Sequence, residues 1–214
     1  MTTLFFVRHG QSMANLLRVF AGQLDFELSD LGLRQAEKGA RFLKDHFSID
    51  AIYSSPMKRA MQTAEPAARL YGLEIIPMED LRERSIGVWA GRYNEEIQTL
   101  YPEQYVAWKK RLGFVPEGGE TREAALERFY AAEAEIVSEN KGKNVAVYTH
   151  AGMLSALSTV WIKTLPELED VSVYGNSSIT AISYDDEGIA RRIVLKNHQE
   201  HLGEDITELP AHLI

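Results

Sequence analysis

The sequence predicts an α/β fold, a three-layer α/β/α sandwich with helices on both faces of a mostly parallel central sheet. Short, mainly apolar runs at 4–7, 51–54 and 145–149 are too brief for helical periodicity and are typical of buried strands. Segments with helical spacing follow these runs along the chain. Strands that alternate with helices favour a parallel sheet with helices packed on it, so this architecture is expected here.

Two of the expected helices lie in the first half of the chain. Ser29 is placed to cap a helix whose apolar residues share one face, namely Leu33, Ala36, Ala40, Leu43 and Phe47. Ser55-Pro56 supplies a cap and a first-turn proline for a second helix that runs toward Gly72. Pro66 lies inside that segment and is expected to kink the helix or end it early, because proline lacks a backbone donor.

The middle of the chain predicts a helical lid inserted into one domain that spans 1–214. The helical pattern at 93–141 is interrupted by Pro102 and by a turn at 116–119, and Thr121 is placed to cap its last helix. The other expected elements are a third strand before the lid and, after it, a helix and two strands, at 74–77, 152–162, 179–184 and 189–195.

The composition is that of an ordinary globular protein, and it narrows the class of function. Of 214 residues, 45% are hydrophobic and 25% are charged, which allows a full core. The net charge of -8 argues against nucleic acid as the main partner, because proteins that bind polyanions present basic surfaces. Cysteine is absent, which excludes disulfides, thiolate metal sites and cysteine nucleophiles. The apolar start lacks a basic leader and is too short to span a membrane, so a cytoplasmic location without a membrane partner is expected.

Polar residues follow three of the expected strands directly. The strands end in Arg8-His9, Ser54-Ser55 and Thr149-His150. In open α/β sheets ligands bind beyond the carboxyl ends of the strands. We therefore expect these side chains to meet at one edge of the sheet.

Four motifs in a fixed order indicate the chemistry. They are Arg8-His9-Gly10, Ser54-Ser55-Pro56-Met57-Lys58-Arg59-Ala60-Met61-Gln62-Thr63-Ala64, Leu81-Arg82-Glu83 and Thr149-His150-Ala151-Gly152. Together they resemble the histidine phosphatase superfamily, also called the phosphoglycerate mutase-like family, from Arg8 to about Leu202. The tripeptide alone is a weak signal, whereas four separated matches in order are highly specific.

The resemblance implies roles for five residues. It makes His9 the nucleophile and Glu83 the proton donor, and the phosphate ligands that it implies are Arg8, Arg59 and His150. Phosphoryl transfer mainly needs positioning and compensation of charge on three oxygens, which arginines and a second histidine supply without a metal or another cofactor. The arginines should also lower the pKa of His9, which favours the unprotonated imidazole that a nucleophile requires.

Other matching positions border the phosphate or the substrate in the family. They are Gln11, Asn15, Gly22, Gln23, Arg84, Ala151 and Asn176. The expected partner is a small phosphorylated metabolite, and the sequence neither predicts nor excludes a homo-oligomer. The run Lys109-Lys110-Arg111 is placed to reach a second anionic group on the substrate, although such a run is usually a solvated helix face. The remaining histidines are expected to lie outside the site, on surfaces or in the C-terminal segment: His46, His198, His201 and His212.

Three other functions stay open at this point. A mutase of the same family would pass the phosphoryl group to a second substrate. The segment between the Glu83 motif and 116–121 is short, which resembles the phosphatase branch. Residues 108–111, in contrast, resemble a basic segment of the mutase insertion. A serine esterase would use Ser12, because 10–14 nearly matches a nucleophile elbow, with Ala14 where glycine is needed. A non-catalytic module that binds phosphorylated ligands is the third.

Overall fold

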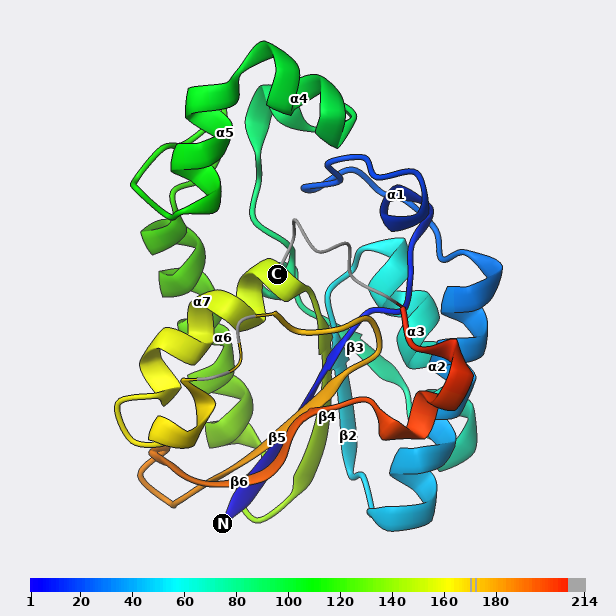
Figure 1. The fold of residues 1–214 in the computed structure, drawn as a ribbon. Coiled ribbons are helices and arrows are strands. Elements are labelled where there is room, and N and C mark those ends of the chain that lie inside the picture. The colour runs from blue at the N-terminus through cyan, green and yellow to red at the C-terminus, as the bar shows by residue number, and fades with distance from the viewer. Residues whose placement is uncertain (170, 172, 208–214) are drawn as a thin grey trace.

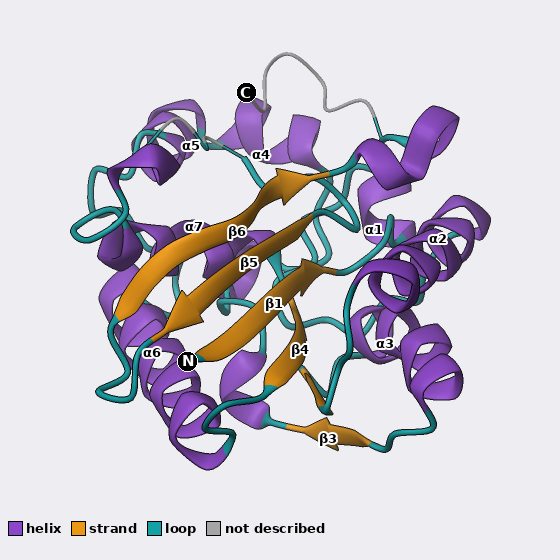
Figure 2. Cartoon of the chain, turned by 90° about the horizontal axis from the view of Figure 1, so that it is seen from below, coloured by secondary structure: helices purple, strands orange, loops and turns teal. Residues whose placement is uncertain are grey.

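The computed structural model describes residues 1–169, 171 and 173–207 and is built on a six-stranded sheet (Figures 1 and 2). The order across the sheet is β3-β2-β4-β1-β5-β6. Neighbouring strands are parallel from β3 to β1, and β5 is antiparallel to both β1 and β6. The mostly parallel sheet predicted from the sequence is confirmed. The strands are β1 Thr2–Arg8, β2 Ala51–Ser54, β3 Ile75–Pro77, β4 Asn144–Thr149, β5 Ile179–Tyr184 and β6 Ala190–His198.

Helices cover both faces of this sheet. In Figure 1, α2 and α3 lie on one side and α6 and α7 on the other, while α4 and α5 stand beyond one end of the strands. None of the helices in the described part of the chain combines the length and apolar character that a membrane crossing needs. The helices are α1 Met13–Leu16, α2 Asp30–His46, α3 Lys58–Tyr71, α4 Asn94–Leu100, α5 Pro102–Lys109, α6 Arg122–Glu139 and α7 Ala151–Trp161, with 3-10 turns at Glu79–Leu81, Gly87–Trp89, Pro166–Leu168 and Glu200–Asp205.

Strand β1 shows why a continuous apolar run forms the centre of the sheet. Leu4 and Phe6 point to the cluster that contains Phe129 of α6 and Leu157 of α7. Phe5, between them, points to the opposite cluster, which is formed with α2 and α3. A strand with helices on both faces needs apolar side chains at successive positions, because successive side chains point to opposite faces.

The predicted lid at 93–141 is too long. Helix α6 is part of the three-layer core, since Phe129 and Ile136 are fully buried against the sheet. Only α4, α5 and the loop up to Thr121 lie outside it. Helical periodicity shows that a helix has an apolar face, but it does not show whether a sheet or a lid covers that face.

The prediction for the start of α3 is also wrong. The helix begins at Lys58, its N-cap is Met57, and no side chain caps it. Ser55 is instead engaged with His150, at 2.8 Å between Ser55 Oγ and His150 Nε2. Pro66 does not end the helix, which continues to Tyr71. Pro66 is buried, and the packing of α3 offsets the hydrogen bond that proline cannot make.

His198 and His201 lie in the C-terminal segment, as expected, and both are half-buried there. The rings of His198 and His201 stack on Phe42 of α2, with centroids 4.4 and 5.2 Å from its ring. They lie at the end of β6 and in the following turn, which folds back onto α2. His46 is exposed as expected, and His212 lies outside the described residues.

This stack predicts a loss of stability at acidic pH. Burial, and then the neighbouring His198, lowers the pKa of His201 to about 4. A base with a lowered pKa in the folded state stabilises the fold fully above its unfolded pKa near 6.5, and this contribution is lost as the pH falls toward 4. We expect the free energy of unfolding to fall by about 2 kcal/mol over this range, after discounting for partial exposure. The variant His201→Phe keeps the stacked ring and should remove this part of the pH dependence of the free energy of unfolding. If urea titrations at several pH values give the same pH dependence for both proteins, the assignment is contradicted.

Candidate active site

The site is formed where β1, β4 and β2 end side by side. Arg8 pairs with Thr149 in the parallel register, and the His9 backbone N–H donates to the Thr149 carbonyl at 3.0 Å. This brings the His9 and His150 rings to a centroid distance of 5.2 Å. The sequence prediction that the polar strand ends converge is therefore confirmed for this pair.

His9 is held in the tautomer that a nucleophile needs. Its Nδ1 lies 2.7 Å from the Gly10 carbonyl, which only accepts, so Nδ1 carries the proton and Nε2 keeps a lone pair. Only 5% of the residue is exposed. Burial, followed by the charges of Arg59 and Arg8, holds the pKa of His9 well below its usual value. The ring is therefore neutral at pH 7.

Two buried arginines flank this ring. Arg8 donates from Nη1 to the Tyr174 carbonyl at 2.5 Å, and its Nε has no partner among the described residues. Arg59 donates from its two terminal nitrogens to the carbonyls of Leu24 and Gly22, both at 2.9 Å. Burial lowers the pKa of Arg8 to about 10, which still leaves it charged. Each guanidinium retains donors beyond those it uses on the backbone, which suits a phosphoryl oxygen.

His150 is fully buried behind this group. Its Nε2 is paired with Ser55 Oγ, while its Nδ1 has no partner among the described residues. Burial first, and then Arg59, His9 and Arg8, lower its pKa well below the usual value. The residue is also the N-cap of α7, so the first backbone amides of that helix lie at the same place.

Glu83 faces this group from the loop between β3 and α4. Its Oε1 accepts from the Arg84 amide at 2.8 Å and its Oε2 from the Gly152 amide at 3.1 Å. Arg128 of α6 holds the same loop, donating to the carbonyls of Asp80, Arg82 and Glu83. Sequence analysis missed Arg128, because nothing in a helical pattern shows that one of its arginines reaches a distant loop.

The contact with Gly152 predicts a sensitive position. A Cβ at residue 152 would lie 2.4 Å from Glu83 Oε1, so Gly152→Ala must displace the carboxyl. We expect kcat/KM on alkyl phosphates to fall by about 10²-fold, the cost of roughly 1 Å of misplacement. Gly39→Ala is the matched control, since a Cβ there meets its nearest atom, His201 Nε2, only at 3.6 Å. The prediction fails if both variants turn over substrate like the wild type.

A cavity of about 240 Å³ opens onto these groups. Eight of the predicted residues line it, namely Arg8, His9, Asn15, Gly22, Arg59, Glu83, Arg84 and Ala151. Trp108 of the lid also lines it. The volume suits a phosphoryl group with a small leaving group.

Three predicted substrate-binding residues lie outside the cavity lining. They form hydrogen bonds with the backbone and side chains around the site instead. Gln11 accepts from Ser29 Oγ at 2.7 Å. Gln23 donates to the Glu83 carbonyl at 2.9 Å, and Asn176 donates to the carbonyl of His9 at 3.2 Å. Thr63 Oγ1 accepts from the Gly10 amide at 3.0 Å and so fixes the turn after His9. The sequence analysis assigned no role to this residue.

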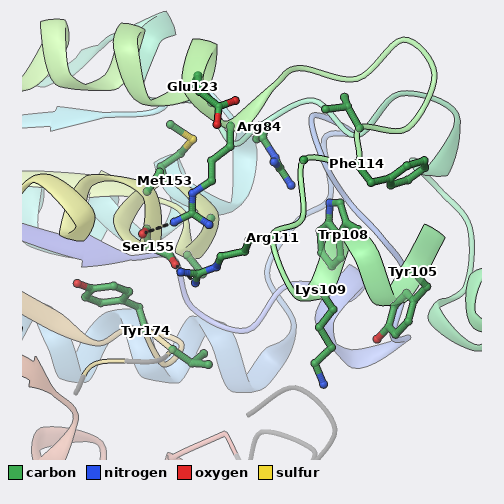
Figure 3. Close-up of a pocket in the computed structure, with 18 of the residues that line it drawn as sticks. Arg84, Tyr105, Trp108, Lys109, Arg111, Phe114, Glu123, Met153, Ser155 and Tyr174 are labelled. Carbon is green, nitrogen blue, oxygen red and sulfur yellow. Dashed lines mark hydrogen bonds between the residues drawn. The ribbon is translucent and has the colours of Figure 1, made fainter. Parts of the chain in front are cut away.

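A second cavity of about 450 Å³ adjoins the first, between the lid and α7 (Figure 3). Arg8, Arg84, Trp108, Ala151 and Gly152 line both cavities, so the two are adjacent. Among the described residues, no three histidine, aspartate or glutamate side chains are grouped as they are in metal sites.

Comparison with known proteins identifies the relatives of this chain. Residues 4–198 match the family described as histidine phosphatase superfamily (branch 1). Phosphoserine phosphatase 1 of Hydrogenobacter thermophilus is 31% identical, over 97% of this chain and 98% of that protein. The metal-independent phosphoserine phosphatase of Arabidopsis thaliana is 35% identical, over 73% of this chain and 67% of that protein.

Solved structures agree with these matches. A mycobacterial glucosyl-3-phosphoglycerate phosphatase in complex with VO3 has a TM-score of 0.81 at 30% identity, over 92% of this chain and 99% of that chain. Bacillus stearothermophilus YhfR has a TM-score of 0.85 at 27% identity, over 94% of this chain and 100% of that chain.

Proposed function

Since the chain belongs to the histidine phosphatase superfamily, branch 1, and is a phosphoric monoester hydrolase, we propose that it works through a phosphohistidine at His9. The observation that carries this proposal is the buried His9 ring, whose Nδ1 donates to a carbonyl and whose Nε2 has no hydrogen-bond partner among the described residues. The pair of arginines beside it supplies the positive charge that the transferred group requires.

In the first half-reaction, His9 Nε2 attacks phosphorus and forms a P–N bond while the P–O bond to the leaving group breaks. Arg8 and Arg59 compensate the charge on the equatorial oxygens, and the neutral His150 ring contributes a hydrogen bond rather than charge. Glu83 gives a proton to the leaving alkoxide, which departs as an alcohol.

In the second half-reaction, the Glu83 carboxylate takes a proton from water as the water attacks the phosphohistidine. The P–N bond breaks, inorganic phosphate leaves, and both His9 and Glu83 return to their starting forms. One carboxyl thus serves both steps. The two amide donors that orient Glu83 keep it beside the same small cavity throughout.

The substrate class follows from the relatives and from the size of the site. The relatives are named for phosphoserine and for glucosyl-3-phosphoglycerate, so we propose that this chain acts on a small phosphorylated metabolite. Water is the acceptor in this proposal, although one relative, from Arabidopsis thaliana, is named phosphoglycerate mutase-like protein 4. Nothing favours the esterase, because Ser12 Oγ is engaged with Asn15 as the cap of α1.

A chelator experiment tests this function. We expect the protein to hydrolyse a panel of phosphomonoesters at the same rate with and without EDTA, since arginines compensate the charge that a metal would otherwise compensate. Alkaline quenching during turnover should trap a phosphoenzyme that is labile to acid and stable to base, as phosphohistidine is. Loss of all turnover in EDTA with recovery on adding magnesium would overturn the mechanism.

A further inference from the structure

The segment that carries Glu83 is held by side chains from other parts of the fold. The backbone carbonyls of residues 80–83, four in succession, each accept a hydrogen bond from a side chain outside the segment. Arg128 of α6 donates to three of them, and Thr149, at the end of β4, donates from Oγ1 to the Leu81 carbonyl at 2.9 Å. The position of the Glu83 backbone therefore depends on residues that are distant in the sequence.

Arg128 supplies most of these bonds and uses every N–H of its guanidinium group. Its Nη1 donates to the carbonyls of Asp80 and Arg82 at 2.7 and 2.9 Å, and its Nη2 to the Glu83 carbonyl at 3.2 Å. Its Nε and Nη2 donate to the two carboxylate oxygens of Glu120, at 2.8 and 2.9 Å. A guanidinium has five N–H groups, and these bonds account for all of them. Arg128 also lies outside the lining of both cavities, so it has no N–H left for a phosphoryl group.

Glu120 links this arginine to the two ends of the lid. Its backbone amide donates to the Ser85 carbonyl at 2.9 Å, and its Oε2 accepts from the Ser85 amide at 3.4 Å. The adjoining residues Ile86 and Gly119 form an antiparallel bridge. The chain thus enters and leaves the lid along two paired segments, and the ion pair of Arg128 with Glu120 lies where they meet. The same ion pair holds the loop of the proposed proton donor.

This ion pair is more buried than an ordinary surface pair. The side chains of Arg128 and Glu120 are each 19% exposed, whereas those of Arg69 and Glu37 are 64% and 45% exposed. Exposed pairs hold two flexible side chains at little net gain, whereas a bidentate pair that is shielded from water keeps one geometry. Arg128 is therefore suited to fixing the position of the groups that it bonds.

We propose that Arg128 is a positioning residue for proton transfer, which holds the loop at 80–83 where the Glu83 carboxyl reaches the leaving group. This rests on the proposed function, in which Glu83 protonates that group. The amides of Arg84 and Gly152 orient the carboxyl itself, but those bonds form only when the backbone of Glu83 is in place. The change Arg128→Lys keeps the charge, yet an ammonium with three N–H groups on one nitrogen cannot replace a planar group with five. Misplacing a catalytic group by about 1 Å costs about 10²-fold in rate.

Substrates with poor and good leaving groups test this inference. In Arg128→Lys we expect kcat/KM for alkyl phosphates to fall at least about tenfold, and kcat/KM for p-nitrophenyl phosphate to stay within about threefold of the wild type, because nitrophenolate leaves without a proton. The variant should also release a burst of nitrophenol and accumulate phosphoenzyme, since the displaced carboxylate is the base of the second step. Arg69→Lys is the matched control, because it makes the same exchange in an exposed ion pair, and it should change neither substrate.

A second contact to the same loop provides an independent pair of variants. Thr149→Val removes the hydroxyl that bonds the Leu81 carbonyl and should show the same dependence on the leaving group. Thr149→Ser keeps a hydroxyl at this position and should turn over alkyl phosphates at least about fivefold faster than Thr149→Val. These variants decide the question if Arg128→Lys does not fold.

Comparison with Glu83→Gln separates the possible failures. If Glu83→Gln slows alkyl phosphates selectively, while Arg128→Lys and Thr149→Val slow both substrates equally or slow neither, the positioning role is overturned. If Glu83→Gln itself slows both substrates equally, the proposed role of Glu83 fails, and the inference fails with it.

Discussion

Replacing His9 with alanine is expected to lower kcat/KM for phosphomonoesters by at least about 10⁴-fold. The variant loses the only atom proposed to bond to phosphorus, and the remaining arginines can position the ester but cannot form an intermediate with it. Phosphoenzyme trapped by alkaline quench should disappear together with turnover. Binding of inorganic phosphate should persist, because Arg8 and Arg59 keep the backbone contacts that fix them.

Two control variants make this result specific. His46→Ala removes an exposed histidine of α2, far from the cavity lining, and should keep wild-type turnover. Ser12→Ala removes the cap of α1 at a cost of about 1 kcal/mol in stability, yet should still hydrolyse phosphomonoesters. If Ser12→Ala is inactive while His9→Ala turns over, the nucleophile is the serine and the phosphohistidine mechanism is wrong.

The central sheet could be predicted from the sequence because strands buried on both faces need continuous apolar runs. Successive apolar residues such as Leu4, Phe5 and Phe6 pack alternately into two helical layers. Polar residues then appear where each strand leaves the core, as at Arg8 and Thr149. Parallel strands bring these ends together, so the meeting of His9 with His150 was predictable from local pattern alone.

Features set by side-chain direction were not predictable in this way. The pattern at 55–56 looks like a helix cap, but Ser55 Oγ is engaged by His150, which lies 95 residues away. Gln11 matches a substrate-binding position, yet its side chain turns to Ser29, at the start of α2. In both cases a long-range contact competes with the local preference, and one sequence does not show which contact is stronger.

The basic run at 109–111 shows a further limit of prediction from local pattern. The run at 109–111 resembles a solvated helix face, and Lys110 is indeed exposed. Arg111 differs from its neighbour because α5 ends there and the backbone turns into the left-handed region. Arg111 lines the larger cavity together with Arg84 and Arg122, which come from other segments, so these arginines meet only in the folded chain. Charge patterns along the sequence therefore predicted too little here.

Exchange of Glu83 for glutamine is expected to slow phosphorylation by about 10²–10⁴-fold for alkyl phosphates, but to change it little for p-nitrophenyl phosphate. An alkoxide cannot leave without a proton, whereas nitrophenolate is stable enough to leave unaided. The same variant lacks the base for the second step, so with p-nitrophenyl phosphate it should release a burst of nitrophenol and accumulate phosphoenzyme. Glu79→Gln, at an exposed acid of the same segment, is the matched control and should show neither effect. The glutamine oxygen can accept from one of the two amides, of Arg84 or Gly152, so the variant also loses one orienting hydrogen bond, and the comparison of the two substrates separates that loss from the loss of the proton donor. Equal slowing of both substrates would show that Glu83 positions the ester rather than protonating its leaving group.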